Sequence, residues 1–141
     1  MDTFKPFRIL LVDDNRDFAD SLALLLRWMG HEIHVTYDGG DAFAEACAWT
    51  PDVMLVDIAM PGMDGNALAQ QIRRHPEVGK IVILAVSGFA DERHRQEAQA
   101  AGFEHYAVKP VDHWELSAWI RERLQGRIEV LTPLAADLTP V

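Results

Sequence analysis

The sequence has one cysteine, few basic residues and no long apolar run, and each shortage excludes a class of protein. Cys47 cannot form an internal disulfide, which is typical of a reducing compartment. Only 13 Lys and Arg residues stand against 22 acidic ones, and this net charge of −9 argues against binding to nucleic acid. No apolar run approaches the ~20 residues that a membrane helix needs, and the short apolar stretch near the N-terminus ends in acids, unlike a signal peptide. We therefore expect a cytoplasmic protein without membrane or nucleic-acid partners.

The length and composition are those of one ordinary globular domain. The chain has 141 residues, of which 49% are hydrophobic and 25% are charged, enough for one sizeable core. We expect a short N-terminal extension over residues 1–7, the domain over residues 8–125, and a flexible or loosely packed tail over residues 126–141.

Short apolar runs alternate with amphipathic segments along the domain. The apolar runs predict strands at 8–12, 33–36, 53–56, 81–86 and 105–108, and the amphipathic segments predict helices at 15–29, 41–49, 67–74, 91–101 and 112–125. Buried strands that alternate with helices indicate a parallel sheet covered on both faces. The sequence therefore predicts a doubly wound α/β fold with five strands.

Polar side chains follow these apolar runs at the points where the strands end. They are Asp13 and Asp14 after the first run, Asp57 after the third, Ser87 after the fourth and Lys109 after the fifth. Ligands bind at this edge of an open parallel sheet. A single charge at a strand end is usually a solvated loop residue, but five compatible groups at four of the five strand ends indicate one site.

The chemistry of these five groups favours a phosphoryl group beside a divalent cation. Clustered carboxylates repel one another unless a cation lies between them, and all-oxygen ligands suit Mg²⁺ or Mn²⁺. A phosphoryl group on Asp57 would have the metal on one side, with Lys109 and the Ser87 hydroxyl on the other. Aspartate is a known nucleophile that forms aspartyl-phosphates.

Four motifs carry a resemblance to a known family: LLVDD (10–14), MLVDIAMPGMDG (54–65), ILAVSG (83–88) and YAVKP (106–110). With them, the sequence resembles the receiver domain of two-component response regulators, and it is similar in length to the single-domain chemotaxis type. The resemblance implies a flavodoxin-like receiver fold with strand order 2-1-3-4-5. It also implies a signalling phosphoacceptor that is not an enzyme beyond its own phosphorylation and dephosphorylation.

The resemblance assigns a role to each site residue. Asp57 would accept a phosphoryl group from a phosphohistidine of a sensor kinase, with Lys109 and Ser87 assisting. The metal ligands would be Asp13, Asp14, Asp57 and the backbone carbonyl of Ala59. Tyr106 would be an aromatic switch that turns from exposed to buried as Ser87 moves, and the Lys109–Pro110 peptide bond would be cis.

Two positions tune the lifetime of the phosphoryl group in this family, and here they hold Ala59 and Phe89. Neither side chain can hold an attacking water by a hydrogen bond, and the ring of Phe89 has the size to shield the phosphoryl group. We therefore predict slower self-dephosphorylation than in a receiver with polar groups at these positions.

Phosphorylation is expected to act by shifting a conformational population. The expected readout surface consists of the fourth helix, fifth strand and fifth helix, and its partner is a downstream effector or a second copy of the chain. The expected phosphodonor is a cognate histidine kinase or a phosphotransfer protein.

Other interpretations of the sequence make different predictions. A pseudo-receiver binding module is never phosphorylated, but it typically lacks some of the acidic or lysine positions. A receiver segment of a hybrid histidine kinase would have the same site. A haloacid-dehalogenase-like enzyme normally needs an aspartate where this chain has Ala59. In a flavodoxin-like FMN binder, Asp13 and Asp14 would repel the phosphate.

Overall fold

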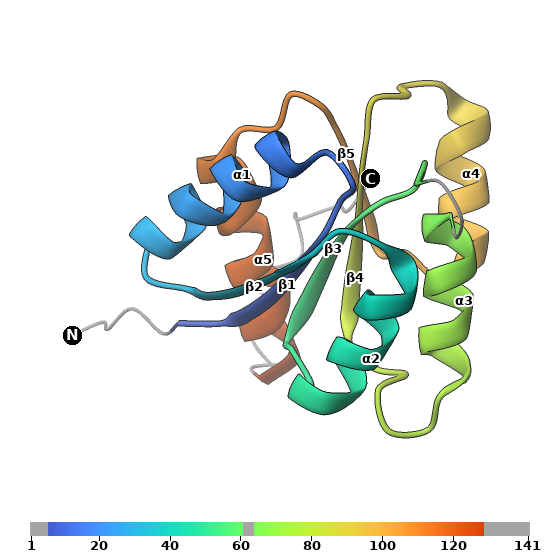
Figure 1. Cartoon of the computed structure of the whole chain (residues 1–141), viewed down its shortest axis with the longest axis horizontal. Helices are drawn as coiled ribbons and strands as arrows, with labels where there is room; N and C mark the ends of the chain where they lie inside the picture. The colour runs from blue at the N-terminus through green and yellow to red at the C-terminus, as the bar shows by residue number, and fades with distance from the viewer. Residues whose placement is uncertain (1–5, 61–63, 129–141) are drawn as a thin grey trace.

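The computed structural model describes residues 6–60 and 64–128, the last three as backbone only, and shows five strands alternating with five helices (Figure 1). The strands are β1 (Arg8–Val12), β2 (Glu32–Thr36), β3 (Val53–Asp57), β4 (Val82–Ser87) and β5 (His105–Val108). The helices are α1 (Arg16–Trp28), α2 (Gly39–Trp49), α3 (Gly65–Arg74), α4 (Glu92–Ala101) and α5 (His113–Ile128).

The strands form one parallel sheet in the order β2-β1-β3-β4-β5. This confirms both the doubly wound fold and the expected strand order. The register pairs Val12 with Val56 and Asp57 with Val86, so the carboxyl ends of the central strands lie level with one another. Side chains that follow these strands therefore meet at one edge of the sheet.

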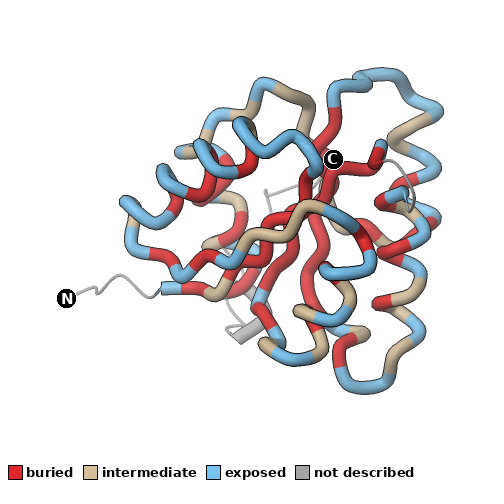
Figure 2. The backbone as a smooth tube through the Cα atoms, in the orientation of Figure 1, coloured by how far each residue is buried: buried red, intermediate tan, exposed pale blue. Residues whose placement is uncertain are grey.

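Two apolar layers cover the sheet because successive side chains of a strand point to opposite faces. Leu10, Met54 and Ile83 face the layer formed by α2, α3 and α4. Leu11 and Leu55 face α1 and α5, and all five of these side chains are at most 1% exposed. Figure 2 shows the central strands β1, β3 and β4 buried along nearly their whole length and the outer sides of the helices exposed. Burial of each such side chain contributes ~1.5–3 kcal/mol, so the layers fix the strand ends firmly.

Each helix begins after an Asn or Asp whose side chain accepts a backbone N–H of the first turn. These residues are Asn15, Asp38, Asp64, Asp91 and Asp112. Such a cap contributes ~1 kcal/mol. The caps explain two differences from the sequence prediction, because α2 begins at Gly39 rather than at residue 41, and α3 begins at Gly65 rather than at residue 67.

Two element boundaries differ from the prediction in a further way. The fourth strand is shifted by one residue, so that Ser87 is its last member and Ile81 precedes it. The last helix continues past Gly126 to Ile128, because a glycine weakens a helix by only ~1 kcal/mol and does not by itself end it. The flexible tail was predicted over residues 126–141; residues 126–128 belong to α5, and residues 129–141 lie outside the described residues.

Several large apolar side chains lie on the surface of α1 and at the start of α5. Trp28 is 73% exposed and Trp114 is 57% exposed, and their rings meet edge to face at 6.2 Å. Leu24 and Leu25 of α1 are exposed as well. Over residues 6–60 and 64–128, none of the helices has the length and apolar character needed to cross a membrane.

Candidate functional site

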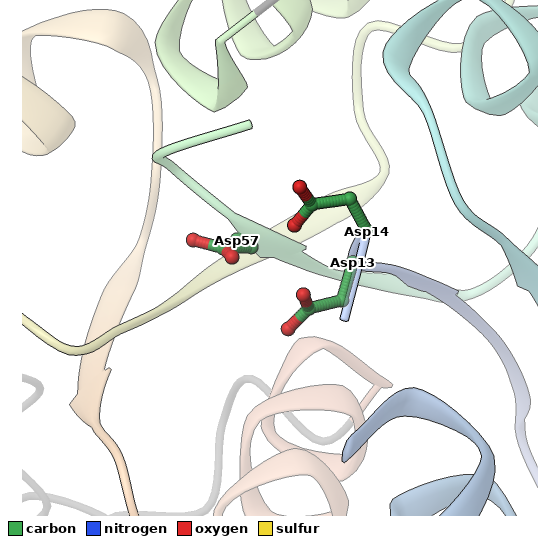
Figure 3. A group of neighbouring side chains, drawn as sticks. All are labelled: Asp13, Asp14 and Asp57. Carbon is green, nitrogen blue, oxygen red and sulfur yellow. The ribbon is translucent and has the colours of Figure 1, made fainter. Parts of the chain in front are cut away.

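Three carboxylates meet at the carboxyl edge of the sheet. Asp13 and Asp14 follow β1, and Asp57 ends the neighbouring strand β3. Figure 3 shows their carboxyl groups turned to the same side of the sheet edge. One oxygen from each lies within 4.8 Å of the others. The structure thus brings together the three acidic residues that the sequence analysis selected.

The carboxylates of Asp13 and Asp57 are buried, whereas Asp14 is exposed. Asp13 Oδ1 accepts the Asn15 N–H at 2.9 Å, and Asp57 Oδ1 accepts the Ala59 N–H at 3.0 Å. Burial raises the pKa of Asp57, and the negative charge of Asp13 raises it further, against the opposing effect of the Ala59 N–H. The ionised form of Asp57 is therefore held in an unfavourable environment.

Lys109, directly after β5, supplies the positive charge of the site. Its Nζ atom lies 2.9 Å from Asp13 Oδ2 and 3.5 Å from Asp57 Oδ2. Partial burial opposes its charged form, but the bond to Asp13 and the two carboxylate charges outweigh this and raise the pKa of Lys109. The ammonium also lies 4.3 Å from the ring centre of Phe18 in α1. The peptide bond from Lys109 to Pro110 is cis.

The donor set fits a small divalent cation. The Lys109 ammonium pairs with two of the three carboxylates, so negative charge remains in excess, and all the converging ligand atoms are oxygens. Such a set matches the preference of Mg²⁺ and Mn²⁺. Asp13, Asp14 and Asp57 are the residues that would hold such an ion.

Ser87 and Tyr106 are both buried and are connected through one residue. Ser87 Oγ accepts the Phe89 N–H at 3.0 Å, and the Tyr106 hydroxyl donates to the Phe89 carbonyl at 2.7 Å. The ring of Tyr106 is 5% exposed, with the Arg95 guanidinium 5.0 Å from its centre. In this structure Tyr106 therefore occupies the buried position.

Three residues near the site were not selected from the sequence. Asn15 donates its N–H to Asp13, Phe18 lies against the Lys109 ammonium, and His94 stacks its ring on that of the selected residue Phe89. Only Asn15 had a signal, since it directly follows the acidic pair and caps α1. The other two contacts join separate elements, and nothing in the local sequence indicates them.

Comparisons with known proteins decide the family. The model of the response regulator receiver domain matches residues 9–121. The chain belongs to this family. It is 34% identical to the protein PilH of Pseudomonas aeruginosa over 119 residues, which cover 84% of this chain and 98% of PilH. A crystal structure of a putative response regulator from Chloroflexus aurantiacus matches with a TM-score of 0.81 and 30% identity over 86% of this chain and 99% of that one.

A second solved structure agrees with this assignment. The CheY-like receiver domain protein of Methanospirillum hungatei matches with a TM-score of 0.81 and 26% identity over 89% of this chain and 98% of that chain. The expected family and fold are therefore both confirmed. Receiver domains are signalling phosphoacceptors of two-component systems rather than conventional enzymes, and the acidic cluster of this chain is compatible with the Mg²⁺ that they bind.

Proposed function

We propose that this receiver domain accepts a phosphoryl group on Asp57 from a phosphohistidine of a sensor kinase or phosphotransfer protein. The observation that carries the proposal is the convergence of Asp57 with the acidic pair and Lys109 at the carboxyl edge of the sheet. We further propose that residues 8–125 are the unit that performs this function, in the cytoplasm.

The two oxygens of Asp57 would have different tasks in the transfer. Oδ1 accepts the Ala59 N–H, which orients the carboxylate, while Oδ2 faces Lys109. Oδ2 would form the new bond to phosphorus as the bond from phosphorus to the donor imidazole nitrogen breaks. That nitrogen keeps the electron pair of the broken bond. Transfer of this kind needs mainly alignment and neutralisation of charge.

Lys109 and the acidic residues would divide the neutralisation of charge. The Lys109 ammonium can bond an oxygen of the phosphoryl group on Asp57 once it leaves Asp13. A cation held by Asp13, Asp14 and Asp57 would supply the remaining positive charge near the phosphoryl oxygens. The Ala59 carbonyl is proposed as a further ligand of that cation.

Ser87 and Tyr106 would transmit the change to the surface. To donate its hydroxyl proton to the phosphoryl group, Ser87 would turn its Oγ away from the Phe89 N–H that it now accepts. Because the Phe89 carbonyl is the acceptor of the Tyr106 hydroxyl, movement of this loop reaches Tyr106 directly. We propose that α4, β5 and α5 then present an altered surface to a protein effector or to a second copy of the chain.

One experiment separates this function from that of a binding module that is never phosphorylated. The chain is incubated with Mg²⁺ and acetyl phosphate, and its intact mass is measured. The proposal expects one phosphate adduct, which is absent without Mg²⁺ and absent in Asp57→Asn. A chain without an adduct, under conditions in which a known receiver is phosphorylated, would refute the proposal.

A further inference from the structure

The side chain of Phe89 packs against α4 through His94. Its ring stacks on the imidazole of His94, with the ring centres 4.2 Å apart and the planes 7° from parallel. The other side of the ring faces solvent, since Phe89 is 46% exposed. The stacking contact with His94 therefore holds this aromatic side chain against α4.

His94 is itself fixed by the residue that caps α4. Its Nδ1 atom lies 2.6 Å from Asp91 Oδ1, and its backbone N–H is donated to Asp91 Oδ2. Asp91 is the N-cap of α4, so both contacts are anchored at the start of a helix. The imidazole is therefore a rigid platform for the ring of Phe89.

The backbone of Phe89 is restrained by other groups. Its N–H is donated to Ser87 Oγ, and its carbonyl accepts the Tyr106 hydroxyl. The ring and the backbone of this residue therefore depend on different partners. A change at His94 releases the ring and leaves the two backbone hydrogen bonds in place.

Open space adjoins the loop at Gly88. Apart from its chain neighbours Ser87 and Phe89, a Cβ atom placed on Gly88 would have no heavy atom of the described residues within 4 Å. A large apolar ring that loses its contact with His94 tends to cover other surface, because exposed apolar area is unfavourable in water. The free space beside Gly88 is the adjacent position in which it can do so.

We propose that His94 is a positioning residue that holds Phe89 against α4 and so keeps the approach to Asp57 open. This inference rests on the proposed phosphorylation of Asp57. Loss of the His94 ring lets Phe89 turn towards the site and hinder both the phosphodonor and the water that hydrolyses the phosphorylated aspartate. His94 thus acts through Phe89 and touches no reacting atom.

A double-mutant cycle tests this role. The parent chain, His94→Ala, Phe89→Ala and the double variant are phosphorylated with acetyl phosphate and Mg²⁺, and the rates of gain and loss of the adduct are followed by intact mass. Both rates are expected to fall roughly two- to tenfold in His94→Ala, the range that an aromatic contact contributes. No difference is expected between Phe89→Ala and the double variant.

Two further measurements exclude a general effect on folding. His94→Phe keeps a flat ring for stacking and is expected to restore rates close to those of the parent, and thermal unfolding checks that each variant is folded. Unchanged or faster rates in His94→Ala, or an equal fall in the Phe89→Ala background, overturn the inference alone. A parent chain that never forms the adduct overturns the proposed function and this inference together.

Discussion

Lys109 and Asp13, which follow the last and the first strand of the sheet, form an ion pair with 2.9 Å between Nζ and Oδ2. The same ammonium is 3.5 Å from Asp57 Oδ2. The Lys109 ammonium therefore pairs with two buried carboxylates, and it lies closer to Asp13 than to the proposed phosphoacceptor Asp57. Uncompensated negative charge is left beside Asp57, and this has consequences for stability.

Neutralising Asp57 is expected to stabilise the protein in the absence of divalent cations. The raised pKa of Asp57 means that its ionisation at pH 7 destabilises the folded state relative to the unfolded chain. Asp57→Asn keeps the oxygen that accepts the Ala59 N–H and should raise the free energy of unfolding, measured with urea. The exposed Glu77→Gln is the control for loss of one charge and should change it by less than about 0.5 kcal/mol; equal effects of the two substitutions would contradict the argument.

Mg²⁺ is expected to raise the thermal unfolding midpoint of the parent chain. Binding to the folded state alone stabilises it by ~2.7 kcal/mol when the free ion is at a hundred times its Kd. Asp13→Asn should abolish most of this rise, because it removes one of the three converging carboxylates. NaCl at matched ionic strength is the control. The site assignment would fail if Asp13→Asn responded to Mg²⁺ as the parent does.

A polar side chain at position 59 is expected to shorten the lifetime of phosphorylated Asp57. Asparagine there can hold an attacking water by a hydrogen bond, which alanine cannot do. We expect Ala59→Asn to accelerate loss of the adduct roughly two- to tenfold, the range for one hydrogen bond of ~0.5–1.5 kcal/mol, as followed by intact mass after removal of the donor. Ala59→Val, similar in size but apolar, is the control, and a lifetime that is unchanged or longer in Ala59→Asn would show the reasoning to be wrong.

Substitution of Arg73 is expected to lower the free energy of unfolding more than substitution of an exposed basic residue does. Its guanidinium donates to the backbone carbonyls of Gly79, Ile81 and Gly102. It also pairs with the carboxylate of Glu104. A lysine cannot reproduce this planar set of donors. Arg73→Lys should therefore lower the free energy of unfolding by ~2–3 kcal/mol, measured with urea.

The neighbouring Arg74 provides the matched control for that substitution. It is exposed in the same helix, so Arg74→Lys should change the free energy of unfolding by less than about 0.5 kcal/mol. Similar costs at the two positions would mean that the carbonyl contacts of Arg73 contribute little.

The buried His31 is expected to make stability depend on pH. Its Nδ1 accepts the Phe7 N–H, its Nε2 lies 3.1 Å from Ser117 Oγ, and burial, with Arg121 nearby, lowers its pKa below 6.5. The folded protein then binds fewer protons than the unfolded chain, so the free energy of unfolding should fall as the pH drops from 7 through this range.

His31→Asn is the variant that tests this dependence. The asparagine oxygen can still accept the Phe7 N–H, but the group no longer titrates. We expect a loss of ~1–2 kcal/mol at pH 7 and a weaker decline of stability towards pH 5, measured with urea at each pH. His113→Asn is the control for the removal of a histidine. If stability fell towards pH 5 as steeply in His31→Asn as in the parent chain, the pH dependence would belong to other groups.

The acidic cluster and Lys109 could be placed together from the sequence because the ends of buried parallel strands are visible in it. Each buried strand is a nearly continuous apolar run, so the point at which it ends is visible as a polar residue. In a parallel sheet these ends share an edge, and that places Asp13, Asp57 and Lys109 together without any knowledge of side-chain packing.

The surroundings of the site could not be predicted in this way. The contact of Phe18 with Lys109 and that of His94 with Phe89 depend on rotamers and on how helices lie against loops. Neither contact changes the apolar pattern of the segment that contains it. The end of α5 was missed for a related reason, because Gly126 stops a helix only when the residues after it prefer another conformation.

The pairing of Lys109 with Asp13 also bears on biosynthesis. All three aspartates leave the ribosome before the strand that delivers the lysine, and that strand joins the sheet only at its far edge, beside β4. A nascent chain or a fragment that stops before β5 therefore has the acids without their counter-ion. Any chemistry that needs both is confined to molecules whose synthesis and folding have passed β5.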